Sequence, residues 1–552
     1  MNLSRVQRPR IQTLIEVLLL ALAAALFAVH YLHLSADFPN HSPWMDWSKY
    51  TDEGWYGDAA IRHIQRGSWN LPGDFNPAAA LPIWPLFELA VFRFTGVSLV
   101  AARALAVSVF GLILVVAYLL LRRTRSQAAA GPAGSSSLAP AAAILLLAAS
   151  PFCYAFTRLA ILEPLLILFT LLALFAASFA VPSPTSLLRE FTPALALGLL
   201  LPLMILTKTT AVFLIPSVAW MLWASTGYRL RPFLRVGVPA ALLAAAIWLA
   251  YFGLLIRPHF LADYRYLFSA NAYTGITRDN ALKVLTDTFE DGLWMGMLIY
   301  PLGVVAALVV LARLRRFLVE LKDPLVPALL LWAIGYLAFL AYHNNLQPRY
   351  YLVVAVPLTL LIPLVLADIL PRPDSSEPHT KIRIAILALA ALDFAAIVAT
   401  DAAKTLHFVR TPEYTFLHAA QSLDRVVLAD RTHSPLVLSI SGSDLSLMTG
   451  LPSICDDFGT MELPQRIAAY RPGWYATWNE VDDDKMDALA PFYHLVRVAA
   501  FPAFDDPDRN LLILYRLDPP VAEAPRPRHR HLVPRLLQTK LGQQPSTEQL
   551  EH

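Results

Sequence analysis

Three acids and three bases stand at isolated points beside long apolar stretches, where ionisable side chains are rare. The acids are Asp52, Glu53 and Glu163, and the bases are Arg158, Lys208 and Arg349. A carboxylate can take a proton from a hydroxyl group, and cationic side chains hold phosphate through charge-assisted hydrogen bonds. A lipid-linked phosphate would need the bases, and chemistry at its head group would need an acid.

Lys208 has the least polar surroundings of the six. It follows PLMILT and precedes an apolar run, so only the neighbouring threonines are polar. A lysine in such a place is costly without an anionic partner or a wet cavity. We expect a phosphate to be that partner, and an internal salt bridge to Glu163 is the alternative.

The other residues have structural explanations as well. Asp52 and Glu53 are acids of the kind that caps the first turn of a helix. Arg158 and Glu163 fall at the junction of two apolar runs, where long side chains can reach the membrane interface. Arg349 and Tyr350 stand at another helix start, where both residue types can anchor a helix to the interface.

The composition places most of the chain in a membrane. Of 552 residues, 57% are hydrophobic and only 15% are charged, against about 25% charged in soluble domains. The net charge of +3 is too small for a nucleic-acid-binding protein of this size, so we expect no nucleic-acid partner. Cys153 and Cys455 are too few for a disulfide framework or a Cys-rich metal site, and we expect two unpaired thiols.

About eleven apolar runs are long enough to be spans of about 20 residues. They are residues 11–34, 101–121, 139–156, 164–181, 192–207, 211–226, 236–256, 294–312, 325–342, 350–369 and 382–400. Alternate connections are rich in Arg and Lys, which places them in the cytoplasm. The first outer loop, 35–100, then contains a short amphipathic helix near 51–69. The segment 81–96 is broken by prolines, so we expect it to lie at the interface without spanning.

The composition changes near residue 401. Strand-like stretches at 435–441, 473–478, 492–501 and 510–517 alternate with helix-like segments at 462–470 and 482–490. We therefore expect a membrane domain over 1–400, a soluble extracytoplasmic α/β domain over 401–518, and a disordered tail over 519–552. Within the α/β domain, Ser441-Gly442-Ser443 after a strand predicts a turn.

The order of these motifs resembles that of the GT-C membrane glycosyltransferases, over roughly residues 1–370. The likeness is greatest to the bacterial branch with the lipid A aminoarabinose transferases and relatives of the protein O-mannosyltransferases. The motifs that carry it are Asp52-Glu53 with Tyr56, residues 154–169 with Arg158 and Glu163, Leu206-Thr207-Lys208, and Arg349-Tyr350 followed by Pro357. Two departures are Glu163, where Asp is commoner, and Gly54-Trp55, where the aminoarabinose branch has a polar or basic residue. Lipid A is therefore not assigned as the acceptor.

The resemblance implies a GT-C-like helical fold of about eleven spans in the cytoplasmic membrane. It implies transfer of a sugar from a polyprenyl-phosphate donor to a lipid, glycan or protein acceptor outside the cytoplasm, with inversion. Asp52 is then the candidate base, Glu53 or Glu163 binds sugar or orients Asp52, and Arg158, Lys208 and Arg349 hold the phosphate. Tyr56 and Tyr350 complete the motifs that would bind the donor.

Three alternatives stay open at this point. No metal or other cofactor is expected, although Asp52, Glu53 and Glu163 could together bind a hard cation. A polytopic bundle with ionisable residues could also be a transporter, although transporters usually place such charges at the bilayer midplane. The third alternative is a noncatalytic membrane scaffold whose outer domain binds a partner.

Overall fold

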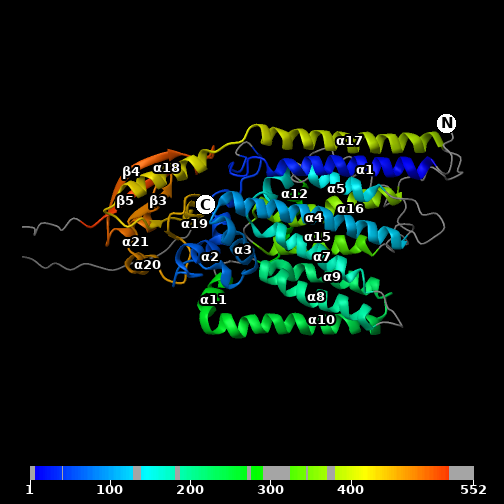
Figure 1. Ribbon diagram of the computed structural model, residues 1–552, viewed down its shortest axis with the longest axis horizontal. Coiled ribbons are helices and arrows are strands. Elements are labelled where there is room, and N and C mark those ends of the chain that lie inside the picture. Colours follow the sequence, from blue (N-terminus) through cyan, green and yellow to red (C-terminus); the bar gives the residue numbers. More distant parts are fainter. Residues whose placement is uncertain are drawn as a thin grey trace, which may run out of the picture.

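The computed structural model describes residues 7–39, 42–128, 138–180, 187–269, 275–289, 324–343, 346–369 and 380–520. A bundle of long helices forms one end of the molecule, and a small α/β domain forms the other (Figure 1). Between them lie the helices α2 (Asp52–Arg66), α3 (Ile83–Thr95) and α19 (Gly442–Thr449). The predicted fold class, a polytopic helical membrane protein with a C-terminal α/β domain, agrees with this arrangement.

Five helical segments in the described part of the chain are long and apolar enough to cross a membrane. They are α1 (Gln7–Ala28) with η1 (Val29–Tyr31), α4 (Leu99–Ala128), α10 (Leu230–Tyr251) with η5 (Phe252–Phe260) and α11 (Leu261–Ser269), α15 (Leu325–Tyr342), and η7 (Pro348–Tyr351) with α16 (Leu352–Ile369). A sixth candidate is the pair α5 (Ala139–Ala149) and α6 (Pro151–Thr157), which is bent by 64°.

Shorter or interrupted helices occupy most of the other predicted spans. They are α7 (Leu162–Ala177), α8 (Leu187–Thr207), η4 (Thr209–Leu214) and α9 (Ile215–Ser225). The 31-residue helix α17 (Thr380–Arg410) covers the predicted span 382–400, and α12 (Arg278–Phe289) is a further helix between spans. The predicted span 294–312 lies outside the described residues, so the number of about eleven spans stays a prediction.

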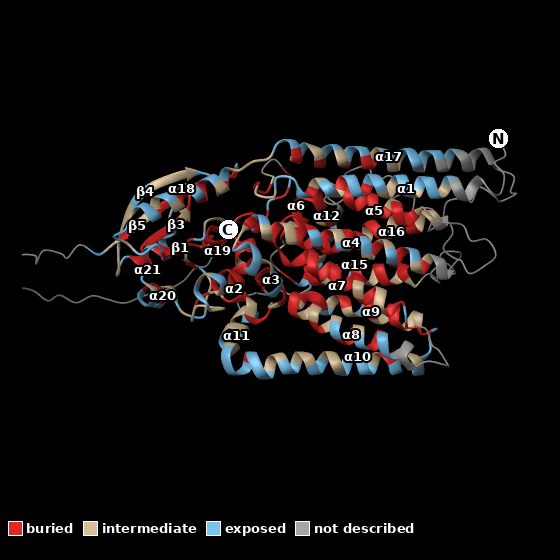
Figure 2. Cartoon of the chain, viewed as in Figure 1, coloured by how far each residue is buried: buried red, intermediate tan, exposed pale blue. Residues whose placement is uncertain are grey.

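Burial separates the inner helices of the bundle from the outer ones (Figure 2). Within the most apolar part of each segment, 67% of the residues are buried in Pro348–Ala367, against 11% in Leu230–Ser269. On α10, Leu234, Leu242 and Leu249 are exposed. An outward face of leucines suits contact with lipid tails, so α10 lines the outside of the bundle.

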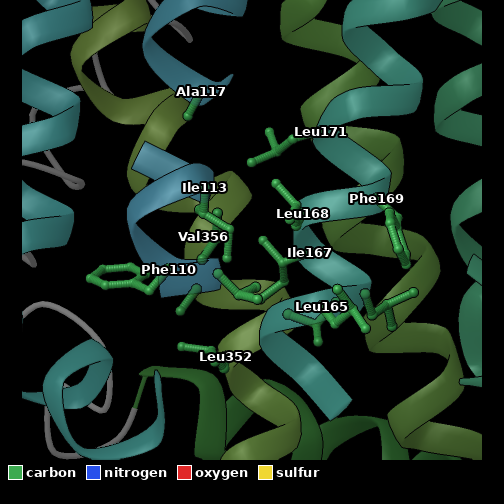
Figure 3. Packing of buried hydrophobic residues seen from close by; sticks show 14 of the residues in the cluster. Phe110, Ile113, Ala117, Leu165, Ile167, Leu168, Phe169, Leu171, Leu352 and Val356 are labelled. Atoms are coloured by element: carbon green, nitrogen blue, oxygen red, sulfur yellow. The ribbon is translucent and has the colours of Figure 1, made fainter. Parts of the chain in front are cut away.

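The centre of the bundle is packed from α4, α7 and α16 (Figure 3). Phe110 and Ile113 of α4, Ile167 and Leu168 of α7, and Val356 of α16 are all buried. Between helices in a membrane, association depends on van der Waals packing and hydrogen bonds. This packed centre gives a rigid base to the polar residues at the end of the bundle.

The first outer loop carries η2 (Trp47–Lys49), α2, η3 (Pro77–Ala79) and α3. The predicted amphipathic helix near 51–69 is α2, which packs against α3. The 13 residues of α3 extend only about 20 Å at 1.5 Å per residue, against a hydrocarbon core of about 30 Å. This length agrees with the prediction that 81–96 does not span.

The C-terminal domain is a five-stranded mixed sheet with the strand order β2-β1-β3-β5-β4. Its elements are α18 (Thr415–Ala429), β1 (Val437–Leu438), α19, β2 (Ser453–Ile454), α20 (Leu463–Tyr470), β3 (Trp474–Trp478), α21 (Asp483–Leu489), β4 (His494–Pro502) and β5 (Leu511–Asp518). The pairs β1–β2 and β1–β3 are parallel, and the pairs with β5 are antiparallel.

All four predicted strands and both predicted helices of this domain are present. Sequence analysis did not predict α18, β2 or α19. The predicted turn is present at its first residue, Ser441, where the N–H of Gly442 donates a hydrogen bond of 3.1 Å to Ser439 O, but Gly442 and Ser443 already belong to α19. The helix α17 continues to Arg410, past the predicted domain boundary at residue 400. Residues 521–552 of the predicted tail lie outside the described residues. Cys153 and Cys455 are both unpaired, as predicted.

The first outer loop and the C-terminal domain are packed against each other. Trp55 of α2 lies edge-on to Phe458, with ring centroids 5.2 Å apart. Lys49 forms a buried ion pair with Asp506 at 2.8 Å. At the start of α18, Asp37 accepts a hydrogen bond of 2.8 Å from the backbone N–H of Phe416. These contacts place the loop and the domain on the same side of the bundle.

Candidate active site

Asp52 is the first residue of α2, and the chain around it explains why the helix begins there. Thr51 has a non-helical conformation, and its hydroxyl lies 2.9 Å from both Trp47 O and Asp52 Oδ1. The helix ends at Arg66, and the next residue, Gly67, has a φ of 74°, the left-handed conformation that glycine adopts without strain. Asp52 is only 2% exposed. Burial raises the pKa of its carboxyl, and the nearby Arg349 partly opposes that rise.

Arg349 lies between two carboxylates of the first outer loop. Its Nη2 is 2.6 Å from Asp52 Oδ2, and its Nη1 is paired with Asp46. Asp46 also accepts a hydrogen bond of 2.9 Å from the backbone N–H of Arg349. The arginine is carried by η7, so this ion-pair cluster joins the loop to the start of α16.

Lys208 and Glu163 form the second ion pair of the site. Lys208 has an extended backbone, with φ of −154°, at the break between α8 and η4, while Glu163 lies in the first turn of α7. The ammonium group of Lys208 is 4.1 Å from the centroid of the Tyr350 ring, and the Arg349 guanidinium is 4.6 Å from it. Tyr350 therefore brings the two ion-pair clusters together.

Tyr56 lies one helical turn after Asp52 on α2 and is half-buried. Burial raises the pKa of its phenol well above the usual range, and the negative charge of Asp52 adds to that rise. The phenol is therefore a neutral hydrogen-bonding group. The structure thus brings together six of the predicted residues at this end of the bundle, namely Asp52, Tyr56, Glu163, Lys208, Arg349 and Tyr350.

Glu53 and Arg158 belong to a neighbouring cluster built around Arg103. Arg103 binds Glu53 through two hydrogen bonds, of 2.8 and 2.5 Å, and the N–H of Ala160 donates a third, of 2.9 Å. Arg158 instead donates to the backbone carbonyls of Leu32, at 2.9 Å, and His33, at 2.5 Å. Within the part of the chain that the structure describes, Glu53 and Arg158 thus bind to other residues of the protein and not to the ion pairs of Asp52 and Lys208.

Sequence analysis missed two charged residues of these clusters, Asp46 and Arg103. Asp46 is an acid between tryptophans six positions before Asp52, and Arg103 is a charge inside the apolar run 101–121. Both side chains are buried, at 2% and 4% exposed. An isolated charge among apolar residues, the signal that singled out Lys208, therefore marks these two positions as well.

The three acids proposed as an alternative cation site are each paired with a different cation. Asp52 contacts Arg349, Glu53 contacts Arg103, and Glu163 contacts Lys208. Across the described ranges, no group of three His, Cys, Asp or Glu side chains is arranged to hold a metal ion. Each carboxylate thus lies beside a cationic side chain, and an anionic ligand could bind to these cations.

Comparison with known proteins gives a clear result only at the level of structure. Neither a protein-family model nor a curated protein matches the sequence. The structure of ArnT from Cupriavidus metallidurans in the apo state matches with a TM-score of 0.58 and 14% identity, over 90% of this chain and 97% of that chain. The chain has the GT-C fold.

Two more solved structures share the GT-C fold with this chain. ArnT from Cupriavidus metallidurans bound to undecaprenyl phosphate matches with a TM-score of 0.56 and 14% identity, over 90% of this chain and 97% of that one. The apo oligosaccharyltransferase of Archaeoglobus fulgidus matches with a TM-score of 0.50 and 14% identity, over 90% of this chain and 76% of that one. These matches confirm the fold that the order of the motifs predicted.

Proposed function

We propose that this protein is a membrane glycosyltransferase that moves a sugar from a polyprenyl-phosphate donor to a hydroxyl of a lipid, glycan or protein acceptor. The observation that carries the proposal is the contact of Asp52 with Arg349, next to the Lys208–Glu163 pair across the ring of Tyr350. A transporter or a scaffold would not require this set of groups at one end of a GT-C bundle.

The site supplies a base for the acceptor. The acceptor hydroxyl attacks the anomeric carbon of the sugar while Asp52 takes its proton. Burial raises the pKa of Asp52, which makes the carboxylate a stronger base, and Arg349 helps to keep it ionised. The bond between the anomeric carbon and the phosphate oxygen breaks with that attack, so a single displacement inverts the anomeric centre.

The cations supply the stabilisation of the leaving group. The bond to the sugar leaves its electron pair on polyprenyl phosphate, and Arg349 and Lys208 would hold that growing negative charge. In the structure both cations are paired with carboxylates. A phosphate would therefore join or replace Asp52 and Glu163 as their partner, and a displaced Asp52 becomes available to the acceptor.

The remaining predicted residues support this site. Tyr56 and Tyr350 border the charged groups and can donate hydrogen bonds from neutral phenols. Glu53 holds the helix that carries the base, because it links α2 to α4 through Arg103, and Arg158 holds the chain after α1 at Leu32 and His33. Glu163 would bind sugar hydroxyls once the phosphate takes over Lys208.

The proposed location is the cytoplasmic membrane, with the site and the C-terminal domain facing outward. Within the membrane, the bilayer lipids would contact α10 and α1. The basic connections between spans support this orientation, because Arg and Lys concentrate in cytoplasmic loops. The donor is proposed on the chemistry of the cations, and the neighbour solved with undecaprenyl phosphate supports a lipid of this kind.

Asp52→Asn tests the proposal, because the amide keeps the size of the side chain but cannot accept the proton. We expect sugar transfer to fall by about 10²–10⁴, the usual effect of losing a general base. The readout is mass spectrometry of envelope glycans, lipids and glycoproteins from cells that have the parent protein, the variant or neither.

Asp58→Asn is the matched control. Asp58 lies on the same helix, is buried, and forms an ion pair with Arg62 at 2.8 Å, away from Arg349. This variant should retain transfer wherever the protein is folded. A parental level of transfer by Asp52→Asn would make Asp52 a helix cap without a role in chemistry.

A further inference from the structure

Asp444 of the C-terminal domain lies against the helix that carries Asp52. It belongs to α19, is 1% exposed, and its Oδ1 accepts a hydrogen bond of 3.2 Å from the backbone N–H of Gly54. None of the described residues hydrogen-bonds to its Oδ2. Gly54 is the third residue of α2, so the carboxyl of one domain meets the first turn of a helix in the other.

The residue that precedes α2 does not supply a capping hydrogen bond to the first turn of the helix. The first four N–H groups of a helix have no partner within the helix. The residue before α2, Thr51, makes no side-chain cap bond to the helix backbone, because its hydroxyl contacts Trp47 O and Asp52 Oδ1. The carboxyl of Asp444 therefore takes the part that a capping side chain usually plays.

The backbone of α2 is shaped for this approach. A Cβ added at Gly54 would lie 2.1 Å from the backbone carbon of Ser443 and 2.2 Å from the backbone nitrogen of Asp444. Only glycine permits α19 to come so close. This close approach explains the glycine at position 54, which is one of the departures from the aminoarabinose branch.

We propose that Asp444 is a positioning residue for Asp52, so that the C-terminal domain supplies the cap of the helix that carries the catalytic base. Asp444 itself touches no reacting atom. The proposal rests on the proposed function for the role of Asp52, while the contact between α19 and α2 stands independently of it.

The charge state of Asp444 agrees with this role. Burial raises the pKa of its carboxyl well above the usual range, and the negative charges of Glu53 and Asp52 add to the rise. The raised pKa favours the neutral form of the carboxyl, in which Oδ1 accepts the Gly54 N–H with less negative charge beside the base. Asparagine has the same size and the same acceptor, so it should replace Asp444.

The direct test is amide hydrogen exchange, followed by mass spectrometry, on the full chain in detergent. We expect Asp444→Ala to increase the exchange rate at Gly54 and Trp55 by roughly three- to thirtyfold, as for the loss of one capping hydrogen bond. Asp444→Asn should exchange at the parental rate. Where the alanine variant is not monodisperse, Asp444→Ser replaces it. The serine hydroxyl is one bond shorter than the carboxyl and should not reach the Gly54 N–H, so the same increase in exchange is expected.

Asp37→Ala is the matched control, since Asp37 also joins the two parts of the chain through a helix start. Its carboxylate accepts N–H groups of α18 and does not contact α2. This variant should leave exchange at Gly54 unchanged. Equal exchange in Asp444→Ala and the parent would overturn the proposal, and so would an equal increase in Asp37→Ala, which would indicate general loosening of the domain.

Transfer and donor binding separate this inference from the proposed function. In Asp444→Ala, sugar transfer should fall at least tenfold while the affinity for undecaprenyl phosphate stays parental, and Asp444→Asn should restore transfer. Unchanged transfer in an alanine variant with a loosened α2 would refute the positioning role. If the parent protein transfers no sugar, the proposed function fails. Faster exchange at Gly54 in Asp444→Ala would still support Asp444 as the cap of α2.

Discussion

Replacing Lys208 with methionine leaves a carboxylate in the bundle without its cation. The side chains of Lys208 and Glu163 are 9% and 0% exposed, and none of the described residues hydrogen-bonds to Glu163 Oε2. Removing one partner of such a pair typically costs about 3–5 kcal/mol, because the other charge stays buried. We therefore expect Lys208→Met to destabilise the purified protein by about this amount, measured as a lower thermal unfolding temperature.

The double variant Lys208→Met/Glu163→Gln separates stability from binding. It removes both charges, so most of the lost stability should return. The cation for the donor phosphate is still absent, and a hydrogen bond to a charged group contributes about 1.5–3 kcal/mol. The affinity for undecaprenyl phosphate, measured by equilibrium binding to monodisperse protein in detergent, should therefore fall roughly ten- to a hundredfold.

The ion pair of Lys49 and Asp506 provides the matched control. Its two side chains are each 5% exposed, and it joins the first outer loop to the C-terminal domain. Lys49→Met/Asp506→Asn should bind undecaprenyl phosphate with parental affinity. Parental stability of Lys208→Met would refute the buried pair, and parental affinity of the double variant at Lys208 and Glu163 would remove both residues from the donor site.

Two further predictions concern α2 and its neighbours. Gly54→Ala places a methyl group against the backbone of α19, so it should destabilise the protein by about 1–3 kcal/mol despite the better helix propensity of alanine. The control is Gly237→Ala on α10, where the nearest atom to the added methyl group is 3.6 Å away, and its stability should not fall. Thermal unfolding in detergent compares the two variants. Asp46→Asn removes a negative charge that raises the pKa of Asp52, so a smaller fraction of the base is protonated at low pH and the acid limb of the transfer rate should move to lower pH. A pH–rate profile measures this shift, and an unchanged or higher midpoint would contradict it.

The features that sequence analysis predicted correctly are those with a local pattern. The apolar runs, the short helix after residue 51 and the strands near 473–478 and 510–517 all follow from the spacing of apolar residues. Lys208 was identified because a single charge in a long apolar run is costly wherever its partner lies. Such signals need no knowledge of the tertiary contacts.

The pair of Lys208 and Glu163, the alternative considered for Lys208, is present in the structure. The other partners could not be predicted, because the contacts join distant parts of the chain. Asp46 and Arg349 are separated by 303 positions, and Gly54 and Asp444 by 390. Nothing in the local sequence links such residues. The pairing of Glu53 with Arg103 was missed for the same reason, and the glycine at 54 was noted as a departure without its cause.

The long separation between α2 and α19 has a consequence for synthesis of the protein. Residues of α2 leave the ribosome 390 positions before Asp444, their partner across the interface. At about 5–20 residues per second, this interval lasts roughly 20–80 s. During that time the start of α2 lacks the carboxyl that caps it. A chain interrupted before Asp444 therefore contains the ion pairs of the site but not this contact.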